Sequence, residues 1–203
     1  MALVSSYDGF MLDYGGVVVH FQSDSDQAKL AQIAGIPRDL FTELYWSERL
    51  DYDKDIISGI EYWHSIAQRS GVTLSQRVIQ SLIDLDNHSW MQFDSEMWEW
   101  IDQLRAAGKR VGLISNMPRD LGEALKSSTQ RLTNFDQVTL SYEIHAAKPE
   151  PAVYEHCLEG LDTPPQQTLL IDDRIENVQG AELLGIRALQ FTSRDDLMLR
   201  LRA

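Results

Sequence analysis

Three short apolar segments, far apart in the chain, each end in polar residues. These segments span 9–12, 111–114 and 168–171, and the residues that follow them are Asp13, Ser115-Asn116 and Asp172-Asp173. Strands that alternate with helices of about 10–15 residues are typical of a parallel sheet. The sequence therefore predicts an α/β fold with a doubly wound, Rossmann-like parallel sheet. Because ligands bind at the carboxyl ends of such strands, the polar residues are expected to meet in one crevice.

The segments that surround these strands have helical patterns. Met97, Ile101 and Leu104 share one face of a helix that ends at Gly108. The rest of this region is expected to contain, in order, a helix from Pro118, a strand over 138–144, a helix over 151–160, a helix that ends at Gly185, a strand over 188–191 and a C-terminal helix.

Residues 21–91 interrupt this alternation with helical patterns only. Helices are expected over 24–34, 39–46 and 60–70, and a capping box of Thr73 and Gln76 predicts the start of a fourth. Tyr45 and Trp46 are adjacent and cannot both face one core, so one of them is expected to line a cleft, whereas Trp63 is expected in the core. The chain is thus predicted to divide into an α/β core of residues 1–20 and 92–203 and an inserted all-helical domain of residues 21–91.

The composition indicates a globular protein with an acidic surface. Hydrophobic residues make up 43% of the chain and the net charge is −13, which disfavours partners such as nucleic acid or anionic membranes. The first residues do not resemble a signal peptide, no apolar run is long enough to cross a bilayer, and the single cysteine, Cys157, fits a reducing compartment and a packing role. We therefore expect a cytoplasmic protein; its oligomeric state is not predicted.

Each polar strand end also has an ordinary structural explanation. Asp13 could cap a turn, and Ser115-Asn116 and Asp172-Asp173 could cap the helices that follow them. Lys148 alone would be a surface lysine, although prolines after it fix the path of the backbone. The acidic composition nevertheless requires that any phosphate-binding site carry local positive charge, which Lys148 and helix N-termini could supply.

Four motifs, taken together and in this order, resemble those of the haloacid dehalogenase superfamily. They are Asp13-Tyr14-Gly15-Gly16-Val17, Ser115-Asn116, Lys148-Pro149, and Leu170-Ile171-Asp172-Asp173 with Asn177. The resemblance covers roughly residues 7–20 and 92–200, and the helical segment resembles the family's cap domain in position and helicity. Within the superfamily, the sequence most resembles bacterial glucose-1-phosphate phosphatases and the phosphatase domain of soluble epoxide hydrolases.

The resemblance implies a Mg²⁺-dependent hydrolase that removes phosphate from a small phosphorylated metabolite of the sugar-phosphate type. Asp13 would act as nucleophile and form an aspartyl-phosphate, which water then hydrolyses. Ser115, the backbone at Asn116 and Lys148 would bind the phosphate. The metal ligands would be Asp13, the backbone carbonyl of Gly15 and Asp173, with Asp172 alongside.

Gly15 departs from the family pattern. Members of the family commonly have an aspartate two residues after the nucleophile, and this aspartate serves as general acid and base. Its loss typically costs about 10²–10⁴ in rate unless another group replaces it. His20, with Asp24 nearby, is the candidate replacement, and a solvated or structurally bonded histidine is the alternative. Without a general acid, leaving groups of low basicity are favoured, so sugar 1-phosphates are expected to react faster than 6-phosphates.

Two other functions are compatible with these residues. A 2-haloacid dehalogenase on the same fold would displace halide without a metal, and the pair Asp172-Asp173 argues against it. A catalytically weak binding or regulatory member would account for Gly15, whereas Asp13, Lys148 and the acidic pair argue against that reading. Dependence on Mg²⁺ separates a phosphatase from a dehalogenase, and turnover of an aryl phosphate separates an enzyme from a binding protein.

Overall fold

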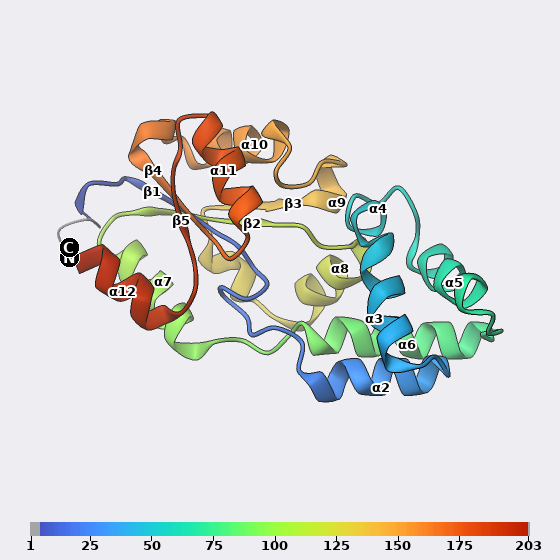
Figure 1. The fold of residues 1–203 in the computed structure, drawn as a ribbon. Helices are drawn as coiled ribbons and strands as arrows, with labels where there is room; N and C mark the ends of the chain where they lie inside the picture. Colours follow the sequence, from blue (N-terminus) through green and yellow to red (C-terminus); the bar gives the residue numbers. More distant parts are fainter. Residues whose placement is uncertain (1–4, 203) are drawn as a thin grey trace.

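A five-stranded parallel sheet forms the centre of the protein, with strand order β3-β2-β1-β4-β5 (Figure 1). The computed structural model describes residues 5–202, so the ends of the expected core at 1–4 and 203 lie outside the described residues. The strands are β1 (Gly9–Leu12), β2 (Arg110–Ser115), β3 (Gln137–Leu140), β4 (Thr168–Asp172) and β5 (Arg187–Gln190). The predicted α/β fold, a doubly wound sheet with an inserted helical domain, is confirmed.

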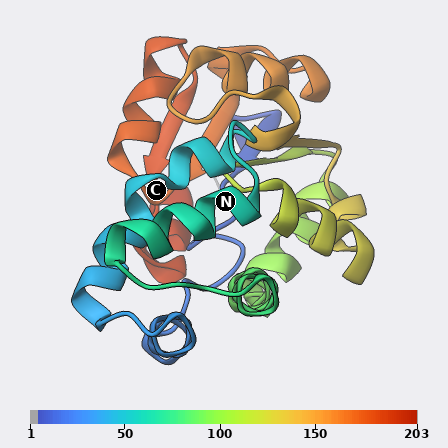
Figure 2. The same cartoon turned by 90° about the vertical axis from the view of Figure 1, so that its right-hand side faces the viewer.

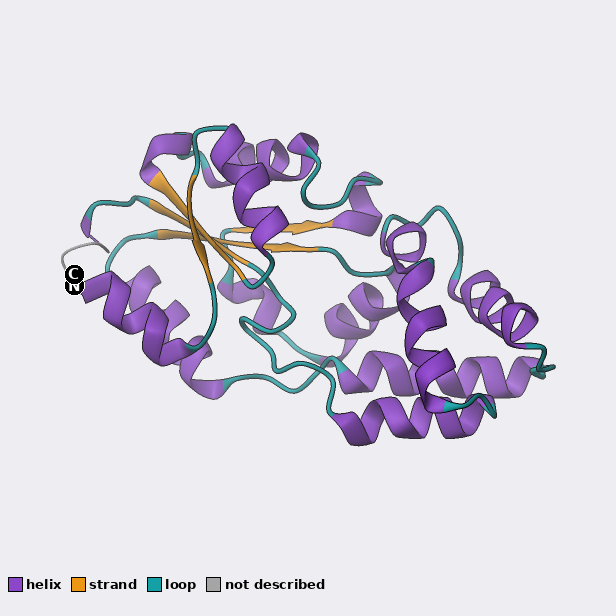
Figure 3. Cartoon of the chain, in the orientation of Figure 1, coloured by secondary structure: helices purple, strands orange, loops and turns teal. Residues whose placement is uncertain are grey.

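Alternate residues of the strands face opposite layers of helices. Phe10 and Leu12 pack in one hydrophobic cluster with side chains of α7 (Ser95–Ala106) and α12 (Arg194–Arg202). Met11 packs in another cluster with side chains of α10 (Pro151–Leu161) and α11 (Ile175–Leu183). Figure 3 shows the strands between these two layers of helices. This alternation is the period of two that a strand buried on both faces requires.

The register of the central strands brings the expected site residues to one edge of the sheet. Leu12 lies opposite Leu113 of β2 and Ile171 of β4. Asp13 therefore lies level with Asp172, and Ser115 lies one step further along β2. The short apolar strands thus position the polar residues that follow them.

Between β1 and α7, all residues are described, and five helices form the helical insert. They are α2 (Asp24–Ala34), α3 (Arg38–Ser47), α4 (Arg49–Asp53), α5 (Gly59–Ser70) and α6 (Gln76–Ser89). The insert lies at one end of the sheet and faces the viewer in Figure 2. It has a hydrophobic cluster of its own, in which Trp63 is fully buried. In the described part of the chain, no helix is long and apolar enough to span a membrane.

The two segments that join the helical insert to the sheet lie side by side. The backbone N–H of His20 donates to the carbonyl of Gln92 (2.8 Å), and the N–H of Asp94 donates to the carbonyl of Val18 (3.2 Å). The chain therefore leaves and re-enters the α/β core at one place. The domain bounds of 21–91 stay a prediction.

Three local expectations are wrong. The sequence pattern does not reveal α4, because five residues are too few to show a helical period. Thr73 does not open α6; Ser75 caps this helix instead, and its hydroxyl accepts a hydrogen bond from the N–H of Val78. The strand expected over 138–144 ends at Leu140, and the short helix α9 (Ser141–Ile144) follows it. The hydroxyl of Ser141 makes hydrogen bonds with the backbone N–H and carbonyl of Met117, so this residue is held by its side chain and not by strand pairing.

Cys157 has the packing role that its helical neighbourhood predicts. It is fully buried on α10, and a Cβ at Gly112 of β2 would lie only 2.9 Å from its Sγ. Burial raises the pKa of the thiol to about 12. A thiol that stays protonated at neutral pH is a poor nucleophile, so Cys157 serves close packing between α10 and the sheet.

Candidate active site

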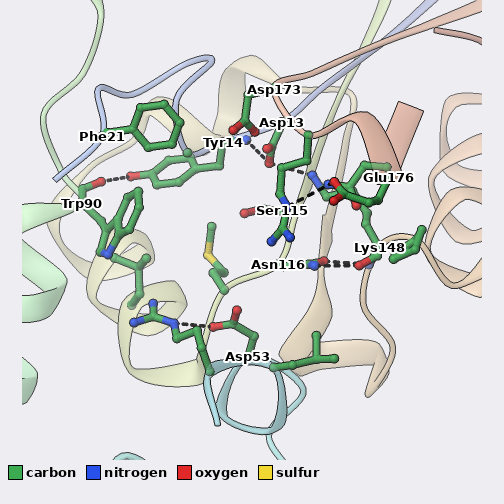
Figure 4. A pocket seen from close by; sticks show the side chains of 18 of the residues that line it. Asp13, Tyr14, Phe21, Asp53, Trp90, Ser115, Asn116, Lys148, Asp173 and Glu176 are labelled. Atoms are coloured by element: carbon green, nitrogen blue, oxygen red, sulfur yellow. Dashed lines mark hydrogen bonds and ion pairs between the residues drawn. The ribbon is translucent and has the colours of Figure 1, made fainter. Parts of the chain in front are cut away.

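A cavity of about 610 Å³ lies between the carboxyl ends of the central strands and the helical insert. It brings together most of the residues that the sequence predicts for the site: Asp13, Gly15, Ser115, Asn116, Lys148 and Asp173. Figure 4 shows Asp13 and Asp173 together at one end of this cavity and Asp53, from the insert, at the other end.

Asp13 follows β1 directly and is almost fully buried. Its Oδ1 accepts hydrogen bonds from the backbone N–H of Tyr14 and from Lys148 Nζ, both at 2.7 Å. Its Oδ2 accepts no hydrogen bond from an amide, ammonium or hydroxyl group of the described residues. Burial raises the pKa of Asp13 well above the usual range and the charge of Asp172 adds to this, whereas Lys148 opposes it. Tyr14 and Lys148 therefore hold one oxygen in place, and the carboxyl group of Asp13 also contacts that of Asp173.

Lys148 holds the two buried carboxylates of the site together. Its Nζ lies 2.7 Å from Asp13 Oδ1, 2.6 Å from Asp172 Oδ2 and 3.0 Å from the carbonyl oxygen of Ile114. An ammonium group has three N–H donors, so all three are engaged. Contact with a phosphate oxygen would require Lys148 to exchange one of these partners, and its main role in this arrangement is to neutralise and position the carboxylates.

The side chain of Asn116 positions Lys148, because both of its polar atoms hydrogen-bond to the backbone of Lys148. Its Nδ2 donates to the carbonyl of Lys148 (2.9 Å), and its Oδ1 accepts from the N–H of Lys148 (2.8 Å). By contrast, the Ser115 hydroxyl and the backbone N–H of Asn116 make no hydrogen bond to another described residue. Ser115 ends β2 and Asn116 follows it, and both residues line the cavity, where these two groups could bind an anion.

Asp172 and Asp173 have different environments. Asp172 is fully buried, and its oxygens accept from Lys148, from the N–H of Arg174 and from Asn177 Nδ2. Asp173 is only half-buried and lines the cavity; burial raises its pKa, and the charge of Asp172 raises it further. Asp172 is therefore committed to holding Lys148 and Asn177, whereas Asp173 can bind a ligand.

The acidic residues at this end of the cavity fit a divalent cation. Asp13, Asp172 and Asp173 offer carboxylate oxygens that lie within 4.8 Å of one another. Lys148 is the one ammonium among them, so negative charge is in excess. Mg²⁺ prefers oxygen ligands of this kind, and a cation between Asp13 and Asp173 would relieve the repulsion that burial makes costly. The donor set thus supports the predicted magnesium site, for which Gly15 could add a backbone carbonyl.

An aromatic ring occupies the space beside Gly15. Gly15 does not have a positive φ, so its backbone can carry a side chain, but a Cβ there would lie 3.2 Å from Cζ3 of Trp90. Trp90 is held in place through its carbonyl, which accepts from the Tyr14 hydroxyl (2.9 Å), and through its indole N–H, which donates to the Tyr45 hydroxyl (3.3 Å). Sequence reasoning missed Trp90, because it lies far from the motifs at the end of the insert.

The structure does not bring His20 into the cavity. His20 is exposed and does not contribute to the lining, and Asp24 is exposed at the start of α2. The alternative of a solvated histidine describes His20 better, since the residue is exposed. Of the adjacent aromatic residues in the insert, Trp46 lines the cavity, whereas Tyr45 is buried in the insert.

A buried ionic network forms the wall of the cavity on the side of the insert. Arg49 donates from Nε to Asp53 Oδ1 (2.9 Å) and from Nη1 to Asp86 Oδ2 (3.0 Å) and to the Tyr45 hydroxyl (2.6 Å). The Tyr45 hydroxyl in turn donates to Asp86 (2.6 Å). Burial raises the pKa of Asp53 to about 6, against the opposing effect of Arg49. Sequence reasoning missed this network, because its members lie on three different helices.

We expect Arg49→Met to destabilise the fold by about 3–5 kcal/mol, because it leaves two carboxylates buried without a cation. Arg119→Met is the matched control: Arg119 also pairs with an aspartate, Asp55, but this pair lies at the surface, with the two side chains 53% and 23% exposed, and should contribute less than about 1 kcal/mol. Urea unfolding of both variants tests this. Equal losses of stability would show that the Arg49 network does not behave as a buried ionic cluster.

Known hydrolases and phosphatases are similar to this chain in sequence. Residues 7–185 match the haloacid dehalogenase-like hydrolase family. A phosphatase of Mycobacterium tuberculosis is 24% identical over 189 residues, which cover 90% of this chain and 86% of that protein. The sesquiterpene phosphatase astK of Aspergillus oryzae is 29% identical over 99 residues, which cover 49% of this chain. The matched segment is half of that relative's length.

Solved structures share the fold at low sequence identity. The magnesium complex of a haloacid dehalogenase family enzyme from Bacteroides thetaiotaomicron, bt-2542, superposes with a TM-score of 0.79 at 22% identity, covering 98% of this chain and all of that one. Structures of similar fold include both such enzymes and haloacid dehalogenases, so the fold does not separate the two reactions. The family match extends over most of the described residues, and the chain therefore belongs to the haloacid dehalogenase-like hydrolases.

Proposed function

We propose that the protein is a phosphoric monoester hydrolase that forms an aspartyl-phosphate on Asp13. The observation that carries this proposal is the arrangement around Asp13: Tyr14 and Lys148 fix one carboxylate oxygen, and the carboxyl group also contacts a second cavity carboxyl, that of Asp173. This arrangement suits a carboxylate nucleophile that acts together with a divalent cation.

In the first step, Asp13 Oδ2 attacks the phosphorus atom and the bond from phosphorus to the leaving oxygen breaks. The Ser115 hydroxyl and the N–H of Asn116 donate to phosphoryl oxygens and hold them for attack. Lys148 keeps the nucleophile oriented and neutralises part of the negative charge. Water then attacks the phosphorus of the aspartyl-phosphate, which releases inorganic phosphate and restores the Asp13 carboxylate.

Asp13, Asp173 and the carbonyl of Gly15 would hold Mg²⁺, which reduces the repulsion between a carboxylate and a phosphate group that must approach each other. Asp172 supports this site indirectly, through Lys148 and Asn177. Gly15 offers no side chain to protonate the leaving oxygen. The substrate on this account is a small phosphate monoester, and a leaving oxygen of low basicity favours its hydrolysis.

Removal of the metal tests this proposal. We expect EDTA to abolish hydrolysis of 4-nitrophenyl phosphate and Mg²⁺ to restore it. Asp173→Asn should raise the Mg²⁺ concentration needed for half-maximal activity at least about tenfold, since one of the few hard ligands loses its charge. Glu176→Gln is the matched control, because Glu176 lines the same cavity but lies outside the carboxylate cluster. Hydrolysis that persists in EDTA, or equal shifts in both variants, would contradict the assignment.

Hydrolysis of 4-nitrophenyl phosphate with and without EDTA also separates a phosphatase from a dehalogenase and from a binding protein. A haloacid dehalogenase would release halide from a 2-haloacid and would be indifferent to EDTA. A binding or regulatory protein would bind Mg²⁺ and phosphate without turnover.

A further inference from the structure

We propose that the alcohol portion of the substrate is neutral and largely apolar, such as an aryl or alkyl chain, rather than a sugar or a group with a second negative charge. This inference rests on the proposed hydrolysis of phosphate monoesters and concerns the part of the cavity that lies away from Asp13. It departs from the sugar-phosphate expectation.

Exposed apolar side chains gather in the cavity. Phe21, Trp46 and Leu50 are 56%, 49% and 51% exposed, respectively, and all three line it. They come from the segment after β1, from α3 and from α4, so no single helix face explains their exposure. Large apolar residues are rarely left exposed together unless a ligand or partner covers them. A ligand between these residues would complete their burial.

Phe21, Trp46 and Leu50 form an apolar wall of the cavity, and this wall continues toward Asp13. Trp90 lies against Gly15 and makes an edge-to-face contact with Phe21, whose ring lies 6.5 Å away. Met117 and Leu121 add to the lining from the segment after β2 and from α8 (Arg119–Ser128). Because Tyr14 and Tyr45 fix Trp90 at both its backbone and its indole N–H, this wall is preformed. The group next to the phosphate would therefore contact aromatic carbon.

The polar residues at the far end of the cavity do not favour a second anion. Arg49 is already paired with two carboxylates, Asp53 and Asp86, so this network has no excess positive charge. The other arginine of the lining, Arg174, lies close enough to Asp53 for its charge to lower the pKa of that carboxyl, and it also pairs with Glu176 (3.8 Å), so carboxylates balance its charge too. A substrate with a second phosphate or a carboxylate at its far end would meet negative rather than positive charge.

Two primary alkyl esters with six carbons each test the inference. Hexyl phosphate and glucose 6-phosphate have the same kind of leaving oxygen, so leaving-group basicity differs little and polarity is the main difference. Each methylene that leaves water strengthens binding by roughly fourfold. We expect kcat/KM for hexyl phosphate to exceed that for glucose 6-phosphate at least about tenfold. An equal or higher value for glucose 6-phosphate would overturn the inference while leaving the proposed hydrolysis intact.

Substitution of one wall residue localises the effect. Leu50→Asn should lower kcat/KM for hexyl phosphate about tenfold and should lower it more than the value for glucose 6-phosphate. Leu183→Asn is the matched control, because Leu183 is 88% exposed on α11 and does not line the cavity. If both variants leave hexyl phosphate turnover unchanged, the alcohol portion does not lie against the wall that contains Leu50, and the inference is wrong.

A binding measurement separates this inference from the proposed reaction. By calorimetry in the presence of Mg²⁺, hexylphosphonate should bind the protein at least about tenfold more tightly than methylphosphonate. Equal affinities would overturn the apolar subsite. Tighter binding of hexylphosphonate without turnover of any phosphate ester would support the subsite and contradict the proposed hydrolase function.

Discussion

Asp13→Asn is expected to lower phosphatase turnover at least about 10³-fold without unfolding the protein. An amide oxygen is a poor nucleophile, so the aspartyl-phosphate cannot form. The asparagine can still accept hydrogen bonds at Oδ1 from Tyr14 and Lys148, which hold Asp13 in the structure. Because the substitution also removes one of three crowded carboxylates, the melting temperature should stay the same or rise.

Asp102→Asn controls for the change of charge. Asp102 lies on the exposed face of α7, and its substitution removes the same charge far from the cavity. Both variants are to be compared with wild type in kcat for 4-nitrophenyl phosphate and in thermal unfolding. Hydrolysis by a folded Asp13→Asn protein at a rate near that of wild type would exclude Asp13 as nucleophile.

Restoring an acidic side chain at position 15 is expected to produce the second large effect. Gly15→Asp should increase turnover of alkyl phosphates by up to about 10²-fold and change turnover of aryl phosphates much less, because aryl leaving groups need little protonation. The backbone at Gly15 tolerates a side chain, but the ring of Trp90 lies 3.2 Å from the new Cβ. The full effect is therefore expected only when Trp90 is also made smaller, as in Gly15→Asp with Trp90→Leu.

The double variant needs Trp90→Leu alone as its reference, because loss of the indole removes a packed residue and a hydrogen bond to Tyr45. The readout is kcat/KM for one alkyl and one aryl phosphate in all four proteins. If wild type already hydrolyses both substrates equally well, another group donates the proton. His20→Ala would then be expected to have no effect, since His20 lies outside the cavity.

The polar residues at the strand ends were predictable from the sequence, because each prediction depends only on neighbouring residues in the chain. An apolar segment followed by Asp13, or by Asp172-Asp173, needs only a parallel sheet to place these carboxylates together, and the register of β1 with β4 does so. The helical insert was predictable for the same reason, since its longer helices show their period.

The remaining parts of the site depend on contacts between distant segments. The sequence does not indicate that the side chain of Asn116 hydrogen-bonds to the backbone of Lys148. It also does not indicate that Asp172 accepts three hydrogen bonds from the protein while Asp173 lines the cavity. Trp90 lies next to Gly15 only because the two linkers of the insert run side by side. The five-residue helix α4, which carries Arg49 and Asp53, is too short to show a pattern, yet it forms one wall of the cavity.

Detection of the phosphorylated enzyme tests the central claim most directly. The Mg²⁺-loaded protein would be mixed rapidly with 4-nitrophenyl phosphate, quenched in acid while turning over, and digested for peptide mass analysis. The account predicts a phosphoryl group on the peptide that contains Asp13, and none in Asp13→Asn treated identically. Turnover without any phosphorylated peptide, or phosphorylation at a different residue, would contradict nucleophilic catalysis by Asp13.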